Sequence, residues 1–179
     1  MNNAVFCEDS TAIGGNDSTV SRGSTVIGGD GTKVSGGAYS TVIGGYRSTV
    51  TGGESSTVSG GDRSTVTGGY YSTVSGGDDS TVTGGNSSKV TGGDGSTVTG
   101  GESSTVIGGN GGTVSGGDES TVSGGDGSKV TGGKEALLTL QYWDSKTNRV
   151  RQVTAYVGEN GIEAGKAYKL DENHQFVLA

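Results

Sequence analysis

The sequence predicts an all-β protein: a β-solenoid (β-helix) with sixteen-residue coils of two short strands each, followed by a small β-rich C-terminal cap. Glycine supplies 39 of the 179 residues, whereas hydrophobic residues make up 28%, well below the ~45–50% of ordinary globular domains. Proline is absent, and an eight-residue motif recurs along most of the chain. The composition leaves too little apolar material for one thick core, and the strict period argues against disorder.

Residues 1–9 precede the repeat and are predicted to form an N-terminal cap. They contain Cys7, the only cysteine, which excludes a disulfide within the chain. We interpret Cys7 as a small apolar residue, with a reactive thiol as the alternative. The segment lacks the basic and apolar regions of a secretory signal, so the default expectation is a cytoplasmic location. No run of residues approaches the ~20 apolar residues of a membrane span.

Residues 10–135 are predicted to form the solenoid. From Ser24 the chain reads Ser-Thr-Val-x-Gly-Gly-x-x and keeps this eight-residue step through Glu135. Two earlier units begin at Ser10 and Ser18, and the second lacks two residues. The Ser-Thr-Val-x stretch is rich in β-branched residues and favours a short strand. The Gly-Gly-x-x stretch favours a corner, where we expect glycine to supply a positive φ.

The position after valine shows that two octads make one coil. In alternate octads it holds only serine or threonine, for example Thr51 and Thr67. In the other set it varies between isoleucine, serine and threonine, for example Ile27 and Ser59. The two strands of a coil are therefore not equivalent, and the repeat region corresponds to about eight coils.

Alternation along each strand assigns the inward and outward side chains. Serine and valine are predicted to point inward, and the serines to form a ladder that hydrogen-bonds to itself. The opposite assignment would bury Lys33, Lys89 and Lys129 and expose every valine, so we reject it.

The outward positions of one wall carry paired threonines and form the candidate binding surface. Their expected spacings are ~4.8 Å between coils and ~6.7 Å along a strand, close to repeats of the ice lattice. Because threonine is stiff at χ1, the array would present fixed methyls and hydroxyls. The alternative is that threonine merely favours exposed strand positions. The candidate residues are Thr49, Thr51, Thr65, Thr67, Thr81, Thr83, Thr97, Thr99, Thr113 and Ser115.

Residues 136–179 leave the octad and are predicted to form a C-terminal capping domain. Strands are predicted at Ala136–Tyr142, Arg149–Val157 and Gln175–Leu178, with turns at Asp144–Asn148 and Gly158–Gly161. Such a cap would cover the open end of the solenoid. We expect its apolar contacts to be Leu138, Leu140, Trp143 and Phe176, with a ligand platform as the alternative role for Trp143.

Several functional classes are excluded. The net charge of −7 argues against nucleic acid as a partner. Asp62, Asp78 and Asp94 should stack on successive coils, but the octad lacks the nine-residue period of calcium-binding repeats, so we interpret them as turn residues. His174 has no second histidine or cysteine beside it, so no metal site or cofactor is expected. No nucleophile–histidine pair and no phosphate loop is present, so the sequence predicts no enzyme.

The octads paired into sixteen-residue coils with Thr-x-Thr resemble the central repeats of bacterial ice nucleation proteins, in which alanine-glycine usually stands in place of Gly-Gly. The segment after the repeats is similar to the C-terminal domain of that family. The resemblance covers residues 10–179 and rests on the octads together with Trp143-Asp144, residues 157–164 and residues 168–173.

This resemblance implies a β-solenoid whose Thr-x-Thr wall orders water or adsorbs to ice, and an extracellular or cell-surface location. Three features depart from the family: no N-terminal surface-display domain precedes the repeats, the coils are few, and Tyr39, Tyr46, Tyr70 and Tyr71 do not form a continuous tyrosine ladder. A wall about 34 Å long should adsorb to ice but nucleate poorly unless chains self-associate and align. The alternative function is a structural or protein-interaction rod without ice activity. In a third reading, the wall with Ile27 and Ile43 contacts another protein chain.

Overall fold

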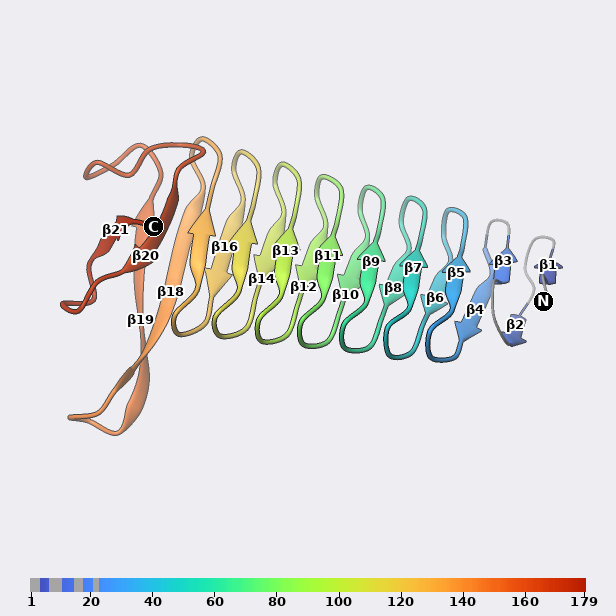
Figure 1. Ribbon diagram of the computed structural model, residues 1–179. Helices are drawn as coiled ribbons and strands as arrows, with labels where there is room; N and C mark the ends of the chain where they lie inside the picture. Colours follow the sequence, from blue (N-terminus) through green and yellow to red (C-terminus); the bar gives the residue numbers. More distant parts are fainter. Residues whose placement is uncertain (1–3, 7–10, 15–17, 21–22) are drawn as a thin grey trace.

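The computed structural model describes residues 4–6, 11–14, 18–20 and 23–179 of the chain. Cys7 and most of the predicted N-terminal cap lie outside these residues. The described part is all-β and forms the expected solenoid, a rod of stacked coils with the cap at its C-terminal end (Figure 1). Each coil contributes one strand to each of two sheets, and neighbouring coils pair in parallel.

Sheet A contains the strands of one wall and ends in two strands of the cap. In spatial order its strands are β1 (Ala4–Phe6), β3 (Ser18–Val20), β5 (Lys33–Ser35), β7 (Thr49–Thr51), β9 (Thr65–Thr67), β11 (Thr81–Thr83), β13 (Thr97–Thr99), β15 (Thr113–Ser115), β17 (Lys129–Thr131), β20 (Ala167–Leu170) and β21 (Phe176–Leu178).

Sheet B forms the opposite wall and also ends in two strands of the cap. From the cap toward the N-terminus its strands are β19 (Arg149–Tyr156), β18 (Leu137–Asp144), β16 (Thr121–Gly124), β14 (Thr105–Ile107), β12 (Lys89–Thr91), β10 (Thr73–Ser75), β8 (Thr57–Ser59), β6 (Thr41–Ile43), β4 (Thr25–Gly28) and β2 (Thr11–Gly14).

The pairing register follows the sixteen-residue period except at the irregular unit. Val66 lies opposite Val82 and Val82 opposite Val98. Where the pairing spans this unit the spacing falls to fourteen residues, with Thr11 of β2 opposite Thr25 of β4. Ser18 of β3 keeps the sixteen-residue spacing to Val34, so that its motif is offset by two positions from that of β5. This offset reflects the two residues missing from the second unit. An even offset preserves the alternation between the two faces of a strand.

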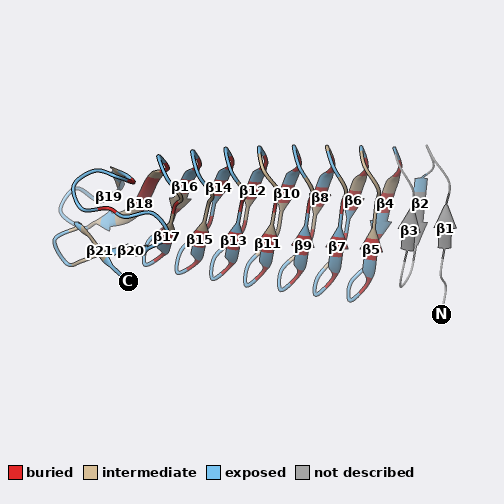
Figure 2. Cartoon of the chain, turned by 90° about the horizontal axis from the view of Figure 1, so that it is seen from above, coloured by how far each residue is buried: buried red, intermediate tan, exposed pale blue. Residues whose placement is uncertain are grey.

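Valine and serine fill the narrow interior, as predicted. Figure 2 shows that buried residues recur on the strands of both walls along the rod. The fourteen valines at every eighth position from Val26 to Val130 are 0–1% exposed. The serine hydroxyls bond mainly to backbone groups rather than to one another. The N–H of Ser48 donates to Ser64 Oγ at 3.3 Å, and Ser64 Oγ donates to the carbonyl of Gly45 at 3.1 Å. The hydroxyl of Ser64 thereby joins its coil to the preceding one, and those of Ser72, Ser80 and Ser88 do the same.

The corner glycines serve a purpose different from the predicted one. The positive φ lies at the fourth corner residue, which is often not glycine: Arg63 has φ 57° and Asp79 φ 54°. The glycine pair is required by close packing instead. A Cβ on Gly109 would lie 2.6 Å from Asp94 N and 2.7 Å from Gly93 C in the preceding coil. Corner glycines therefore allow coils to approach one another.

The cap extends both sheets. Strand β18 continues sheet B in parallel with β16, and β19 folds back against it; β20 pairs antiparallel with β17 and then with β21. Leu138 and Leu140 are buried and Phe176 packs against the core, as expected. The short strand β20 was not predicted. Its Tyr168 is buried, accepts a hydrogen bond from Glu163 N at 2.8 Å and donates one to the carbonyl of Gly161.

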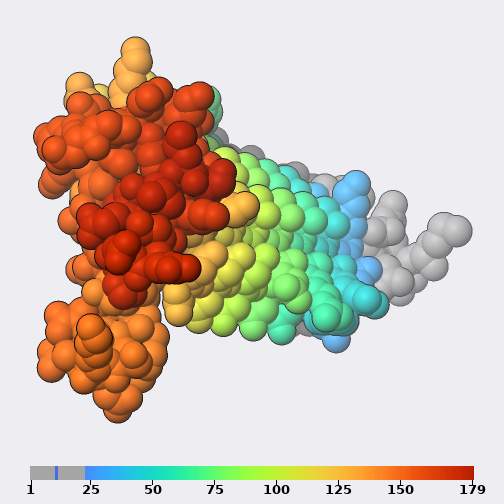
Figure 3. Space-filling view, turned by 60° about the vertical axis from the view of Figure 1, so that its left-hand side comes forward, coloured from blue at the N-terminus to red at the C-terminus, as the bar shows by residue number. Residues whose placement is uncertain are grey.

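The prediction that Trp143 belongs to the apolar interior of the cap is wrong, because this side chain is 52% exposed. Side chains alternate along β18, so Trp143 points to the face opposite Leu138 and Leu140. It also lies beyond Leu140, the last residue of β18 that pairs with the solenoid. The end of β18, the turn that follows it and the beginning of β19 project past the coils as an arm (Figures 1 and 3).

Candidate functional site

The outward face of sheet A brings the ten predicted site residues together. They lie on five consecutive strands, β7, β9, β11, β13 and β15. We call this surface the threonine wall; it consists of Thr49, Thr51, Thr65, Thr67, Thr81, Thr83, Thr97, Thr99, Thr113 and Ser115. Eight of these side chains are exposed, and Thr83 and Ser115 are half-buried.

The wall is an in-register lattice. Thr65 lies opposite Thr81 and Thr81 opposite Thr97, and the second residue of each strand pairs in the same way. Neighbouring parallel strands are ~4.8 Å apart, and two residues along a strand span ~6.6 Å. The rows of threonines therefore repeat at these two spacings along the rod.

The wall hydroxyls are available to solvent. Within the described residues, no hydrogen bond joins a threonine Oγ1 of the wall to another protein group, whereas inward serines such as Ser64 and Ser80 donate to backbone carbonyls of the preceding coil. A threonine hydroxyl offers one donor and two acceptor positions. The wall can therefore order water through both its hydroxyls and its methyl groups.

Lysines limit the wall at both ends. Lys33 precedes the first Thr-x-Thr strand, and Lys129 occupies the equivalent position of β17. Between them, every outward side chain of sheet A is uncharged. Beyond β17 the face passes to β20, where Ala167 lies opposite Thr131. The regular array therefore stops at the cap.

The outward face of sheet B is less regular. The residues that precede the buried valines form a first column, which contains Thr25, Thr41 and Thr57. Lys89 interrupts this column in the middle of the rod. The second column mixes serine and threonine with three isoleucines whose exposed fractions are 36–38%. These isoleucines are Ile27, Ile43 and Ile107.

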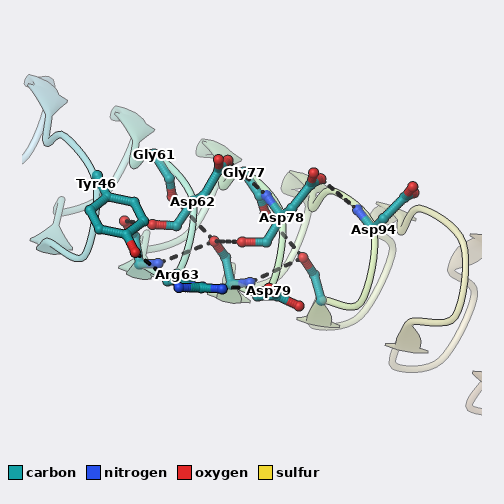
Figure 4. Close-up of polar contacts among 11 residues, drawn as sticks. Tyr46, Gly61, Asp62, Arg63, Gly77, Asp78, Asp79 and Asp94 are labelled. Carbon is teal, nitrogen blue, oxygen red and sulfur yellow. Dashed lines mark hydrogen bonds and ion pairs between the residues drawn. The ribbon is translucent and has the colours of Figure 1, made fainter.

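Stacked Asp and Asn side chains brace the corners that lead from sheet B to sheet A, which we call the B-to-A corners (residues 28–32 and every sixteenth residue after them). Asp62 Oδ1 accepts a hydrogen bond from Asp78 N at 3.0 Å, and Asp78 Oδ1 accepts one from Asp94 N at 2.8 Å (Figure 4). Within the described residues, no cluster of His, Cys, Asp or Glu side chains is arranged to hold a metal ion. These carboxylates therefore serve as acceptors for backbone N–H groups.

Beside this ladder of stacked Asp and Asn side chains, Arg63 connects three coils. It donates a hydrogen bond to the hydroxyl of Tyr46 at 3.0 Å and lies 3.6 Å from a carboxylate oxygen of Asp79. The hydrogen bond to Tyr46, followed by the charge of Asp79, raises the pKa of Arg63. Sequence reasoning missed this link because the three residues belong to successive coils and share no local motif.

No protein-family model, curated protein or solved structure matches the chain. The part of the chain that the structure describes contains no helix long and apolar enough to cross a membrane.

Proposed function

We propose that the threonine wall binds ice or ice-like surface water, so that the protein adsorbs to ice. The observation that carries this proposal is the array of exposed, in-register threonines with no charged residue among them and no hydroxyl bonded to protein. A charged side chain holds its own hydration shell. A stiff lattice of methyls and hydroxyls can instead hold water at fixed spacings.

The extent of the wall favours adsorption over nucleation. The four strands that carry threonine at both outward positions run from β7 to β13. Three inter-strand steps correspond to about 14 Å. A patch of this size can bind to an existing crystal face, whereas it can order only a small cluster of water by itself.

The second candidate function is a non-enzymatic protein-interaction rod. Its supporting observation is the exposure of aromatic side chains at the corners that lead from sheet A to sheet B, where Tyr39, Tyr70 and Tyr71 are 55–67% exposed. Tyrosine is enriched in protein interfaces. In this case the corners would carry the function and the threonine wall would be passive.

Ice-affinity partitioning of a Thr65→Lys/Thr97→Lys variant tests the proposal. Lys33, Lys89 and Lys129 already occupy the equivalent strand position and are exposed, so the substitution is compatible with the fold. The matched control is Thr73→Lys/Thr105→Lys, which places the same charges at exposed positions of sheet B.

We expect the original chain and the control to enter growing ice and the wall variant to stay in the liquid, with circular dichroism showing that all three are folded. Exclusion of the original chain from ice would overturn the proposal. Equal loss of partitioning in both variants would assign the effect to charge and reject a role specific to sheet A.

A further inference from the structure

A small cavity lies where the last B-to-A corner, residues 124–128, meets the cap. Its volume is about 220 Å³, and its walls come from this corner, from the segment 140–143 of β18, and from Lys169, Asp171 and His174. The cavity exists because the coil pattern stops here. Leu140 is the last residue of β18 that pairs with β16, and β18 then continues into the arm instead of turning (Figure 1).

The same interruption leaves a hydrogen-bond acceptor at the edge of the cavity. Asn110 Oδ1 accepts the N–H of Asp126, and Asp94 Oδ1 accepts the N–H of Asn110. Asp126 is the last member of this ladder. Asp126 is exposed, and within the described residues its carboxylate accepts no hydrogen bond, because β18 takes the place of the corner that would follow. The cavity thus offers an acceptor without the backbone donor that its counterparts in earlier corners receive, namely Asp30, Asp62, Asp78, Asp94 and Asn110.

Groups of both charge signs line the cavity. Asp126 and Asp171 are acidic, and Lys169 brings an ammonium group. Asp171 Oδ1 already accepts hydrogen bonds from the backbone N–H groups of Asn173 and Gln175. A charged ligand would meet a like charge on one side. A neutral ligand whose groups both donate and accept hydrogen bonds satisfies the two sides together.

Aromatic side chains supply the apolar part of the cavity. Trp143 lies at its rim, 52% exposed, and also lines a second hollow of about 170 Å³ on the side of Asn110. The Tyr142 ring stacks on His174, with centroids 3.6 Å apart and an angle of 16° between the planes. A pyranose ring has an apolar face of C–H groups that stacks on such rings, and hydroxyls at its edge.

We propose that this cavity binds a neutral hexopyranose ring, which stacks on Trp143 and donates a hydroxyl hydrogen bond to Asp126. A volume of about 220 Å³ is below the ~300–1,000 Å³ of sites for drug-sized ligands, so it holds one sugar ring. The cavity includes no residue of the threonine wall, and this proposal is therefore independent of ice binding.

Trp143 is the only tryptophan of the chain, so its fluorescence reports on the cavity directly. The full chain is titrated with the methyl glycosides of mannose, glucose, galactose and N-acetylglucosamine, and with glycerol as the polyol control. We expect a saturable emission shift with at least one glycoside at a Kd of roughly 1 mM, and none with glycerol. Absence of a saturable shift with all four glycosides at about 100 mM would overturn the proposal.

Variants test whether the cavity is responsible. We expect Asp126→Ala to weaken binding about tenfold, whereas Asp62→Ala, which removes the same kind of acceptor far from the cap, leaves it unchanged. Equal weakening by both would overturn the proposed site. Chemical shifts of Gly127 and the His174 ring measure binding to Trp143→Ala, for which we expect loss, and to Tyr156→Ala, an exposed aromatic control outside the cavity, for which we expect none.

The sugar could be the end of a glycan or a free metabolite, and binding to immobilised and to soluble hexose distinguishes these two sources. Retention on beads that carry the bound hexose through its anomeric oxygen would assign the ligand to the end of a glycan. Binding of the soluble glycoside without retention on the beads would assign it to a free metabolite. Both results support the cavity as a hexopyranose site.

Discussion

Asp78 Oδ1 accepts a hydrogen bond of 2.8 Å from the backbone N–H of Asp94, the residue one coil further along. The same bond joins Asp62 to Asp78 and Asp94 to Asn110. An Asp or Asn at the third position of a B-to-A corner therefore completes the hydrogen bonding of the following coil. Tyr46 occupies this position in one corner and lacks the acceptor.

The first prediction concerns this bond. Asp78→Ala leaves the Asp94 N–H without its acceptor and should cost ~1 kcal/mol, which lowers the thermal midpoint by roughly 2–4 °C. Asp78→Asn keeps the amide oxygen and should retain the original midpoint, as Asn110 does naturally in the ladder. Equal loss in the two variants would assign the effect to charge rather than to the hydrogen bond.

The second prediction separates two roles of glycine within one corner. A Cβ on Gly109 would collide with the backbone of Gly93 and Asp94, whereas one on Gly111 meets open space, although Gly111 has φ 65°. Gly109→Ala should lower the thermal midpoint by roughly 2–12 °C. Gly111→Asn should change stability by ~1 kcal/mol or less, since Asn tolerates positive φ.

Thermal unfolding followed by circular dichroism compares the two glycine variants. The reverse order of stability would mean that the corner needs glycine for its φ and that coil-to-coil approach is not limiting. The ten non-glycine residues that already adopt positive φ at this corner position, such as Arg63 and Ser87, favour the predicted order.

Much of the fold could be predicted from local periodicity. Alternation assigned valine and serine to the interior and threonine to the surface, and the position after valine identified the sixteen-residue coil. The features that escaped prediction depend on residues far apart in the chain. The acceptor for Asp94 N lies on Asp78 in the preceding coil, and the short β20 gains its pairing from β17.

The candidate surface was predictable to the same extent and for the same reason. Each wall threonine is exposed because it alternates with a buried valine, which the sequence shows directly. The cavity at the cap was not predictable, because it results from β18 passing beyond the last corner. Trp143 was misassigned because it is a large aromatic residue in an apolar segment, which is typical of a core residue. Its position on β18 nevertheless places its side chain on the exposed face of the strand.

The third prediction concerns Asp144 at the base of the arm's turn. Thr147 Oγ1 donates a hydrogen bond to Asp144 Oδ2 at 2.7 Å, and Arg151 Nε lies 2.6 Å from the same oxygen. These bonds, that of Thr147 first, hold the pKa of Asp144 well below its usual value. The stabilisation they bring is fully present above pH ~3.9 and is lost as the pH falls below it toward the lower native pKa.

A ¹³C NMR titration of the Asp144 carboxyl group measures this effect. We expect a midpoint clearly below ~3.9 in the original chain and a higher one in Thr147→Val, which removes the hydroxyl donor. A midpoint at or above ~3.9 in the folded original chain would contradict the contacts observed at this turn.

The fourth prediction compares two Asn-Gly sequences, at residues 110–111 and 160–161. Asn-Gly deamidates when the glycine nitrogen attacks the Asn carboxamide carbon and expels ammonia, after which water opens the succinimide to aspartate or isoaspartate. Gly111 N donates to the carbonyl of Asp126 at 2.8 Å, and Asn110 Oδ1 accepts the N–H of Asp126 at 2.9 Å. Both groups needed for the attack are held in place.

Asn160 has no such restraint. It lies exposed in the turn between β19 and β20, and within the described residues Gly161 N donates no hydrogen bond. Alkaline ageing followed by peptide mapping should therefore show deamidation at Asn160 well before Asn110. Asp126→Gly keeps the backbone bonds of the corner and should leave Asn110 protected, whereas urea should equalise the two sites. Faster loss at Asn110 in the folded chain would contradict the protection that stacked corners provide.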